Sequence, residues 1–133
     1  MRNYVFTLFI ISLSFNGFSQ DSTLTRSTLV ENQITEKGIA SFYAKKFNGR
    51  KTTSGEIFYN DKLTAAHKTL KFGTFVKVRN IKNDSTVIVK VNDRLPKKSK
   101  RIIDLSYKAA KQLNFISSGL TKVEITVLDS LKK

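Results

Sequence analysis

Four ionisable side chains in this chain of 133 residues have surroundings that suit acid–base chemistry, and Glu56 is the first along the sequence. It closes residues 51–56 (KTTSGE), in which hydroxyl groups and a glycine precede a single carboxylate. Because glycine lets the backbone approach a ligand closely, the segment suits a binding loop, with Ser54 as a candidate substrate contact. The alternative is an ordinary solvated loop glutamate, which the segment taken alone favours.

Two aspartates adjoin apolar segments. Asp93 and Arg94 directly follow a valine-rich run. A carboxylate at the end of an apolar strand is partly desolvated, which raises its pKa and suits a general acid. Capping of a turn explains Asp93 equally well. Asp104 lies between apolar residues just before a helical segment, where an aspartate interacts favourably with the helix N-terminus, so a structural role is at least as well supported.

His67 is the only histidine and has small, apolar neighbours. Its ordinary pKa of about 6.5 makes it the one side chain that changes charge near neutral pH without a large shift, although an isolated histidine is more often structural. With one histidine and no cysteine, the chain excludes disulfides, cysteine nucleophiles, thiolate zinc sites and the H-E-x-x-H motif. The scattered carboxylates show no ligand spacing, so we expect neither a metal nor a cofactor.

The other charges are mostly basic and give the chain a formal net charge of +14. Lys97 opens a basic run at 97–101 (KKSKR), and shorter basic pairs lie within 45–51. Such runs are usually only solvated, but these could line a groove for an anionic polymer, with Tyr43 and Arg94 as further substrate contacts. Charge alone also suits a nucleic-acid binder. The exported N-terminus described below argues against that reading, and no nucleic-acid partner is expected.

Strands must position most of these side chains, since apolar and polar residues alternate over much of the sequence. The alternation predicts strands at residues 38–44, 74–81, 86–91 and 121–128. Turn-forming residues 82–85 join two of them into a hairpin. The one segment with a helical period starts at Ser106 as N-cap, runs through Leu113 and is followed by Gly119. Several short strands and one short helix predict a single small β-barrel over residues 38–128.

The N-terminus predicts export. Residues 1–20 combine one positive charge, an apolar run of about ten residues and small residues before a cleavage site, which is the pattern of a secretory signal peptide. An N-terminal core helix is the lesser alternative. Polar residues 21–37 predict a flexible arm, and 129–133 a C-terminal tail. We expect an exported monomer in the periplasm or on the cell wall, with no transmembrane anchor and, lacking cysteine, no lipid.

Five segments in register resemble the rare lipoprotein A family, namely residues 38–44, 47–56, 63–70, 89–94 and 101–106. The resemblance runs in order over nearly the whole folded unit. It implies a mainly β fold, a single six-stranded double-psi β-barrel with one or two short helices, shared with expansins. Characterised members of the family are lytic transglycosylases of bacterial peptidoglycan.

The resemblance also assigns site residues. The family's functional acidic residue and histidine fall on Glu56 and His67, and the aspartate of its N-D-R motif falls on Asp93. Asp104 matches an aspartate that faces the groove of expansin-like barrels, whereas Leu95 stands where the family has glycine, which could narrow that groove.

From these matches we predict cleavage of the β-1,4 bond between N-acetylmuramic acid and N-acetylglucosamine, with a 1,6-anhydro product. Asp93 is the predicted acid/base and Glu56 its partner or a stabiliser of the oxocarbenium ion. His67 orients them, and Asp104 is the reserve candidate. The alternative function is a non-catalytic, expansin-like module that binds peptidoglycan.

Overall fold

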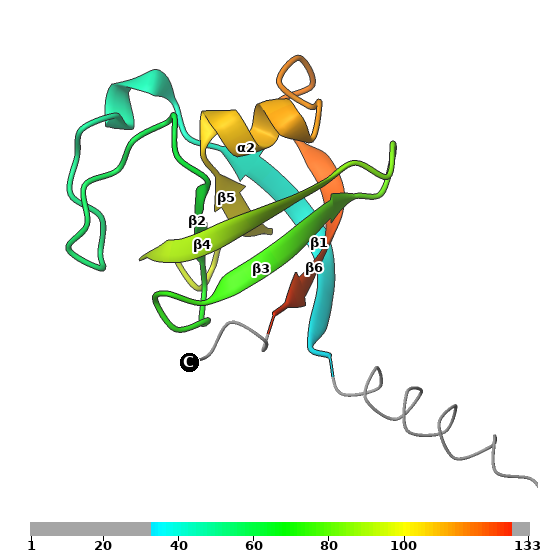
Figure 1. The fold of residues 1–133 in the computed structure, drawn as a ribbon, viewed down its shortest axis with the longest axis horizontal. Coiled ribbons are helices and arrows are strands. Elements are labelled where there is room, and N and C mark those ends of the chain that lie inside the picture. The colour runs from blue at the N-terminus through cyan, green and yellow to red at the C-terminus, as the bar shows by residue number, and fades with distance from the viewer. Residues whose placement is uncertain (1–32, 129–133) are drawn as a thin grey trace, which may run out of the picture. The chain divides into compact units, whose positions relative to one another are not determined.

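The computed structural model describes residues 33–128, which form a closed barrel of six strands (Figure 1). The elements are β1 (Thr35–Phe42), η1 (a 3-10 helix, Lys45–Phe47), β2 (Thr64–His67), β3 (Phe75–Asn80), β4 (Thr86–Arg94), β5 (Arg101–Leu105), α2 (Tyr107–Gln112) and β6 (Thr121–Val127). The expected mainly β, six-stranded barrel with short helices is confirmed. The predicted signal peptide (1–20), most of the predicted arm and the predicted tail (129–133) lie outside the described residues.

Around the barrel the strands follow the order β1-β5-β2-β4-β3-β6, and β6 closes the ring on β1. The pairs β1/β5 and β2/β4 are parallel, whereas the other neighbours are antiparallel. Strands β3 and β4 form the predicted hairpin. Each parallel pair contains one shift of register, after Ile39 in β1 and after Ala65 in β2. Such bulges turn the residues that follow to the other face of the sheet.

The barrel is filled by the side chains that alternate inward along its strands. Val76 and Val78 of β3 are buried, as is Val91 of β4, whereas Lys77 between the first two faces solvent. Helix α2 lies across one end of the barrel (Figure 1) and adds buried alanines to the same core. Burying a valine contributes about 1.5 kcal/mol or more, so these strands form a firm platform for the residues on their outer face.

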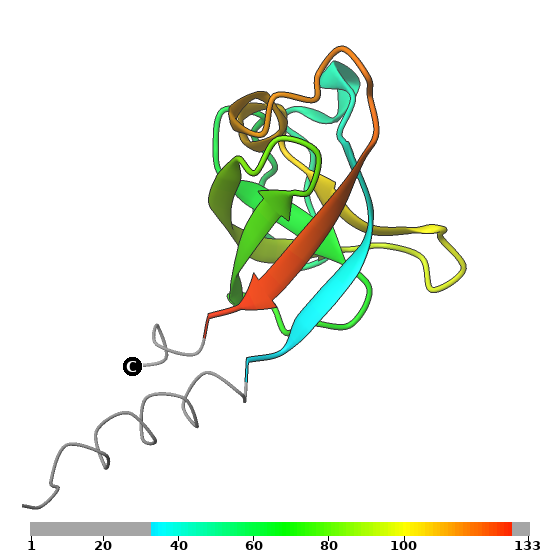
Figure 2. The same ribbon diagram turned by 90° about the vertical axis from the view of Figure 1, so that its right-hand side faces the viewer.

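Strand β1 begins earlier than predicted. Residues 35–37 pair with β6 in antiparallel register, so the prediction that a flexible arm extends to residue 37 is wrong for its last three residues. Figure 2 shows β1 and β6 side by side over this length. The segment is polar and exposed, and its order comes from backbone pairing with a strand far along the sequence, which no local pattern reveals. Strand β1 also ends at Phe42 instead of Ala44.

The predicted helix is confirmed at its start and shorter at its end. The Ser106 hydroxyl accepts a hydrogen bond of 3.3 Å from the Ala109 amide and caps α2. The helix ends at Gln112, and Asn114 adopts φ = 56°, the left-handed conformation expected just beyond a helix. Gly119 belongs to a later turn. Within residues 33–128 no helix is long and apolar enough to cross a membrane.

Candidate active site

A β-bulge in β4 brings Asp93 to the outer face of the barrel. Ala65 of β2 pairs with Val91, but the next pair is Ala66 with Asp93, so Asn92 is skipped. Ala65 and Val91 point into the core. Because faces alternate along a strand, regular pairing would send Asp93 inward as well; the extra residue turns it to the other face. The bulge therefore determines that this carboxylate is available for chemistry.

Four uncharged donors surround the Asp93 carboxylate. Oδ2 accepts a hydrogen bond of 2.6 Å from the Tyr43 hydroxyl. Oδ1 accepts bonds of 2.9 Å and 2.8 Å from the Thr53 amide and hydroxyl, and one of 2.9 Å from the Arg94 amide. Burial raises the pKa of Asp93, but these hydrogen bonds together lower it by more than burial raises it. The pKa of Asp93 therefore lies below its ordinary value. The expectation of a raised pKa is wrong for the free protein.

Tyr43 supports Asp93 from the end of β1. Its ring packs against Phe58 with centroids 4.2 Å apart and meets the edge of Phe47 at 5.9 Å. Burial, followed by the hydrogen bond to Asp93, raises the pKa of the phenol far above its ordinary value. Tyr43 therefore keeps its proton and acts as a fixed donor to Asp93.

Glu56 forms an ion pair with Lys90, whereas Asp93 accepts hydrogen bonds only from uncharged groups within the described residues. Its Oε1 accepts a bond of 3.0 Å from Lys90 Nζ, and its Oε2 one of 3.2 Å from Asn92 Nδ2. The bond from Lys90, then that from Asn92, lowers the pKa of Glu56. The side chain is 48% exposed, so its carboxylate meets solvent or a ligand directly.

The loop 52–56 carries Glu56 and is hydrogen-bonded to Asp93 and Asn92 of β4. Thr53 binds Asp93, and the Ser54 amide donates to the Asn92 carbonyl at 3.3 Å. The Ser54 hydroxyl lies 2.9 Å from that of Thr52, so this predicted substrate contact also holds the loop in shape. Gly55 has φ = +95°, a conformation that other residues adopt with strain. The glycine that suggested close approach to a ligand therefore serves the turn.

Asp104 of β5 lies on the same outer face of the barrel as Asp93. Ala66 pairs with Asp93 on one side and with Asp104 on the other, which sets the two aspartate backbones about 10 Å apart at the usual strand spacing. Arg101 binds Asp104 through Nε at 2.7 Å and a second nitrogen at 3.1 Å, and the Ser41 hydroxyl donates to it. Its side chain is only 14% exposed. This geometry suits a structural ion pair.

His67 points away from this face. It pairs with the core residue Ile103, one position beyond Ala66, so its side chain lies on the opposite side of β2. Nδ1 accepts bonds of 3.1 Å from the Thr69 and Leu70 amides, which leaves the proton on Nε2, 2.9 Å from the Glu36 carboxylate. The structure therefore brings Glu56 and Asp93 to one loop but does not bring His67 to them.

The two basic residues predicted to contact substrate, Arg94 and Lys97, make no side-chain hydrogen bond or ion pair with the two carboxylates in the described part of the chain. Arg94 stacks over Phe72 at 4.3 Å and donates to the His67 carbonyl at 3.2 Å, which ties β4 to β2 below Asp93. Lys97 is exposed in the loop 95–100, which projects from the barrel in Figure 2. Among residues 33–128, no hydrogen bond or ion pair connects Lys97 with Glu56 or Asp93.

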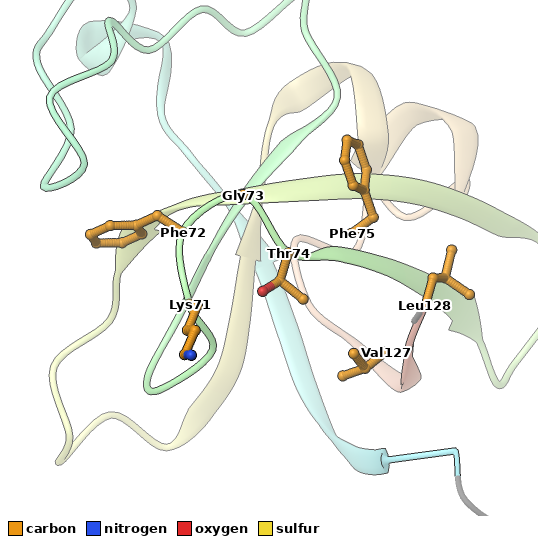
Figure 3. Close-up of a pocket in the computed structure, with 7 residues that line it drawn as sticks. All are labelled: Lys71, Phe72, Gly73, Thr74, Phe75, Val127 and Leu128. Carbon is orange, nitrogen blue, oxygen red and sulfur yellow. The ribbon is translucent and has the colours of Figure 1, made fainter. Parts of the chain in front are cut away.

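A hollow of about 440 Å³ opens beside Glu56, and we call it the Tyr59 pocket. Its lining includes Glu56, Tyr59, Lys62, Thr64, Lys90 and Asn92. A smaller hollow of about 220 Å³ lies between the loop before β3 and the end of β6. Figure 3 shows Phe72 at one edge of it and Val127 and Leu128 at the other. None of the predicted site residues lines that second hollow.

Several residues that contact the predicted site residues were not themselves predicted from sequence. Lys90 faces outward between two buried valines, three residues before Asp93, so the strand alternation contained a usable signal for it. Asn92 adjoins Asp93, but only the bulge shows its role. Glu36 lies 31 residues from His67 and left no local signal.

Residues 35–125 match the protein family described as "Lytic transglycolase". Among curated relatives, a protein of Haemophilus influenzae named endolytic peptidoglycan transglycosylase RlpA is 44% identical over 108 residues, covering 81% of this chain and 38% of the relative. One of the same name from Pasteurella multocida is 53% identical over 94 residues, covering 69% and 32%. The chain thus spans well under half the length of these relatives.

Solved structures with the same fold are more distant in sequence. An expansin of Clavibacter michiganensis superposes with a TM-score of 0.60 at 21% identity, covering 75% of this chain and 53% of that protein. A Streptomyces papain inhibitor gives a TM-score of 0.59 at 19% identity, covering 71% and 94%. These likenesses concern the fold alone. From the match over residues 35–125 together with the closed six-stranded barrel, the chain belongs to the lytic transglycolase family of RlpA-like double-psi β-barrels.

Proposed function

We propose that this protein is an endolytic peptidoglycan transglycosylase. It cleaves the β-1,4 bond between N-acetylmuramic acid and N-acetylglucosamine and leaves a 1,6-anhydro end. Its relatives in H. influenzae and P. multocida carry that activity in their names. The observation that supports the proposal most is a pair of carboxylates on one loop–strand unit, Asp93 among neutral donors and Glu56 beside a lysine.

A bound glycan changes the two carboxylates differently. Displacing water disfavours an isolated charge, so covering Asp93, whose donors are all neutral within residues 33–128, raises its pKa. Covering Glu56 also removes water, but it strengthens the attraction between its carboxylate and Lys90. Asp93 then takes up a proton while Glu56 stays ionised. Two carboxylates with different roles are what the reaction requires.

The reaction needs one proton carrier and no water. Asp93 Oδ2, which receives one hydrogen bond within the described residues, retains a lone pair for the proton. Asp93 donates this proton to the leaving oxygen as the bond from C1 breaks, and the Glu56 carboxylate stabilises the positive charge at C1. The 6-hydroxyl of the muramic acid attacks C1 and returns its proton to Asp93. Protons balance, and no metal or cofactor takes part.

The other predicted residues act at a distance in this scheme. Tyr43 holds Asp93 in place, and Ser54 shapes the loop that presents Glu56. His67 joins β2 to Glu36 of β1, and its role in this scheme is structural. Asp104, Arg94 and Lys97 contribute structure or general attraction to the wall, to which a net charge of +14 also contributes.

The proposed site of action is the periplasm or the cell wall, where peptidoglycan lies. We expect the protein to work there as a monomer. Fractionation of producing cells tests this placement: activity against peptidoglycan should appear outside the inner membrane, and retention in the cytoplasm would contradict it.

Digestion of purified peptidoglycan, and of glycan stripped of its stem peptides, tests the activity. Mass spectrometry should find 1,6-anhydro ends with wild type and at least a hundredfold fewer with Asp93→Asn. Glu124→Gln is a matched control, because Glu124 lies on β6 in an ion pair with Arg79 and should leave the yield unchanged. No anhydro ends from either substrate would refute the enzymatic proposal.

One observation favours a second candidate, a wall-binding module without catalysis. In the free protein the pKa values of Glu56 and Asp93 both lie below their ordinary values, so neither arrives protonated. An expansin of the same fold has been solved in complex with cellohexaose. This reading predicts retention on insoluble peptidoglycan with no new anhydro ends, which the digestion distinguishes directly.

A further inference from the structure

Two buried polar atoms in the described part of the chain have no hydrogen-bond partner, and both belong to residues that line one pocket. They are Thr64 Oγ1 and Asn92 Oδ1. Thr64 is 9% exposed and Asn92 2% exposed. Both residues line the Tyr59 pocket beside Glu56. Because a buried polar atom without a partner costs free energy, two of them in the wall of one pocket point to a ligand that completes them.

The walls above these two atoms suit a sugar. Tyr59 and Ile57 are each 44% exposed, although both are large apolar side chains that usually lie inside a protein. A pocket of about 440 Å³ has the size of a small-molecule site, and its lining combines apolar surface with a few polar groups. An exposed tyrosine ring offers a flat face to a pyranose ring, and the two unpartnered atoms belong to polar residues of the same pocket.

We propose that the Tyr59 pocket is a subsite for an N-acetylhexosamine and that it reads the acetamido group. The assignment rests on the proposed function for its location beside Glu56, and it adds a recognition element that the reaction itself does not require. An amide N–H supplies the donor that Asn92 Oδ1 lacks, and an amide carbonyl supplies the acceptor for the Thr64 hydroxyl. The methyl group packs on the apolar lining formed by Leu63 and Phe75.

Asn92 then connects recognition with catalysis. Its Nδ2 donates to Glu56 Oε2 at 3.2 Å, while its Oδ1 accepts no hydrogen bond within the described residues. An acetamido group bound at Oδ1 therefore fixes the amide plane that orients Glu56. A sugar with a hydroxyl in place of the acetamido group can donate to Asn92 but leaves Thr64 without the carbonyl, and it lacks the methyl group.

Two further hollows are connected to the pocket through shared lining residues. Tyr59 also lines a hollow of about 420 Å³, which shares Asn60 and Asp61 with a third hollow of about 490 Å³ beside α2. Each hollow therefore shares lining residues with the next. Connected hollows suit more than one ring of a glycan, whereas a single sugar would need only the first.

Titration with two neutral tetrasaccharides tests the proposal. Chitotetraose carries an acetamido group on every ring, and cellotetraose carries a hydroxyl instead. We expect the purified wild-type protein to bind chitotetraose at least tenfold more tightly, with NMR shifts centred on Tyr59, Thr64 and Asn92. Equal affinities, or shifts elsewhere, would overturn the proposal.

Variants separate the acetamido contact from stacking. Thr64→Val keeps the shape and removes the hydroxyl, and it should weaken chitotetraose binding about fivefold to tenfold without changing cellotetraose binding. Tyr59→Ala should weaken both sugars alike, and Tyr59→Phe should restore both. Thr86→Val, at an exposed position of β4, is the matched control and should change neither.

An internal water molecule bridging the two atoms would give a different result. Thr64→Val would then lower stability and leave the preference between the sugars unchanged, which contradicts the proposal. These titrations do not depend on cleavage. A preference for chitotetraose without anhydro ends would refute the proposed enzyme and keep the subsite, whereas anhydro ends without the preference would refute the subsite alone.

Discussion

Asp93 lies on β4, and Glu56 lies on the loop 52–56 that is hydrogen-bonded to this strand, yet the surroundings of the two carboxylates differ in kind. Asp93 accepts hydrogen bonds from uncharged groups, namely a phenol, a hydroxyl and two backbone amides. Glu56 accepts one bond from a side-chain amide and one from the Lys90 ammonium. Both pKa values are lowered in the free protein, so the resting state alone does not separate their roles.

In the proposed reaction, the difference emerges when a glycan displaces water. Hydrogen bonds from neutral donors strengthen as the local dielectric constant falls, but the Coulomb attraction of a nearby full charge grows more. Burial is already the largest single influence on the pKa of Asp93, and it acts to raise it. More burial therefore moves Asp93 toward its acid form and leaves Glu56 ionised. In this proposal, the charge of the partners, more than their number, decides which carboxylate carries the proton.

Removing the proton carrier should have the largest effect. Asp93→Asn is expected to reduce the formation of 1,6-anhydro ends by about 10²–10⁴-fold, because the amide cannot transfer a proton. It should also lower the free energy of unfolding by about 1–3 kcal/mol, since Tyr43 and Thr53 lose a charged acceptor. Urea unfolding and mass spectrometry on one preparation measure both. Activity retained per folded molecule would show that Asp93 only fixes the loop.

Glu56→Gln should have the next largest effect on activity and very little on stability. Loss of the negative charge beside C1 should reduce the rate by about 10²–10³-fold. The side chain is 48% exposed, so its bond to Lys90 contributes at most about 1 kcal/mol to folding. A large loss of stability with normal turnover would show that Glu56 has a structural role and takes no part in the reaction.

Acid should destabilise the protein through the same groups. The folded-state pKa values of Asp93 and Glu56 lie below those of the unfolded chain, so the folded state favours their ionised forms. Their contribution is fully present above the unfolded pKa values of about 4 and is lost as the pH falls through the folded values. The free energy of unfolding should fall below about pH 4, and less steeply in Asp93→Asn. Asp61→Asn, at an exposed position, is the control; an equal flattening there would contradict the assignment.

The smallest effect is expected at the other face of β2. Glu36→Ala removes the partner of His67 Nε2 and should lower the free energy of unfolding by about 1 kcal/mol, because the lost bond is partly exposed. Activity per folded molecule should remain within about threefold of wild type. Lys37→Ala, next on β1 and largely exposed, serves as the control. A hundredfold loss of activity at unchanged stability would place His67 in the chemistry.

Sequence reasoning succeeded where a residue's environment is local. Alternating valines predicted β3 and β4, the turn at 82–85 predicted their hairpin, and Ser106 predicted the start of α2. The short strand β2 was missed by periodicity because all four of its residues are buried, which leaves no alternation. Only the resemblance to a family supplied the number of strands.

The candidate site was predicted in part for the same reason. Glu56 and Asp93 lie in segments whose composition is unusual in itself. The division of roles that we propose for them depends on Lys90 and on a bulge at Asn92, and a register shift between two strands has no signature in either strand alone. His67 is a catalytic candidate by residue type, and its contact with the distant Glu36 could not be predicted from the sequence.

The central claim is that bound glycan raises the pKa of Asp93 and leaves Glu56 ionised. A ¹³C NMR titration of the two side-chain carboxyl carbons tests it directly, first in the free protein and then with a saturating glycan that already ends in 1,6-anhydro-muramic acid. We predict that the midpoint of Asp93 moves to higher pH on binding while that of Glu56 stays low. A rise at Glu56 with Asp93 unchanged would contradict the account.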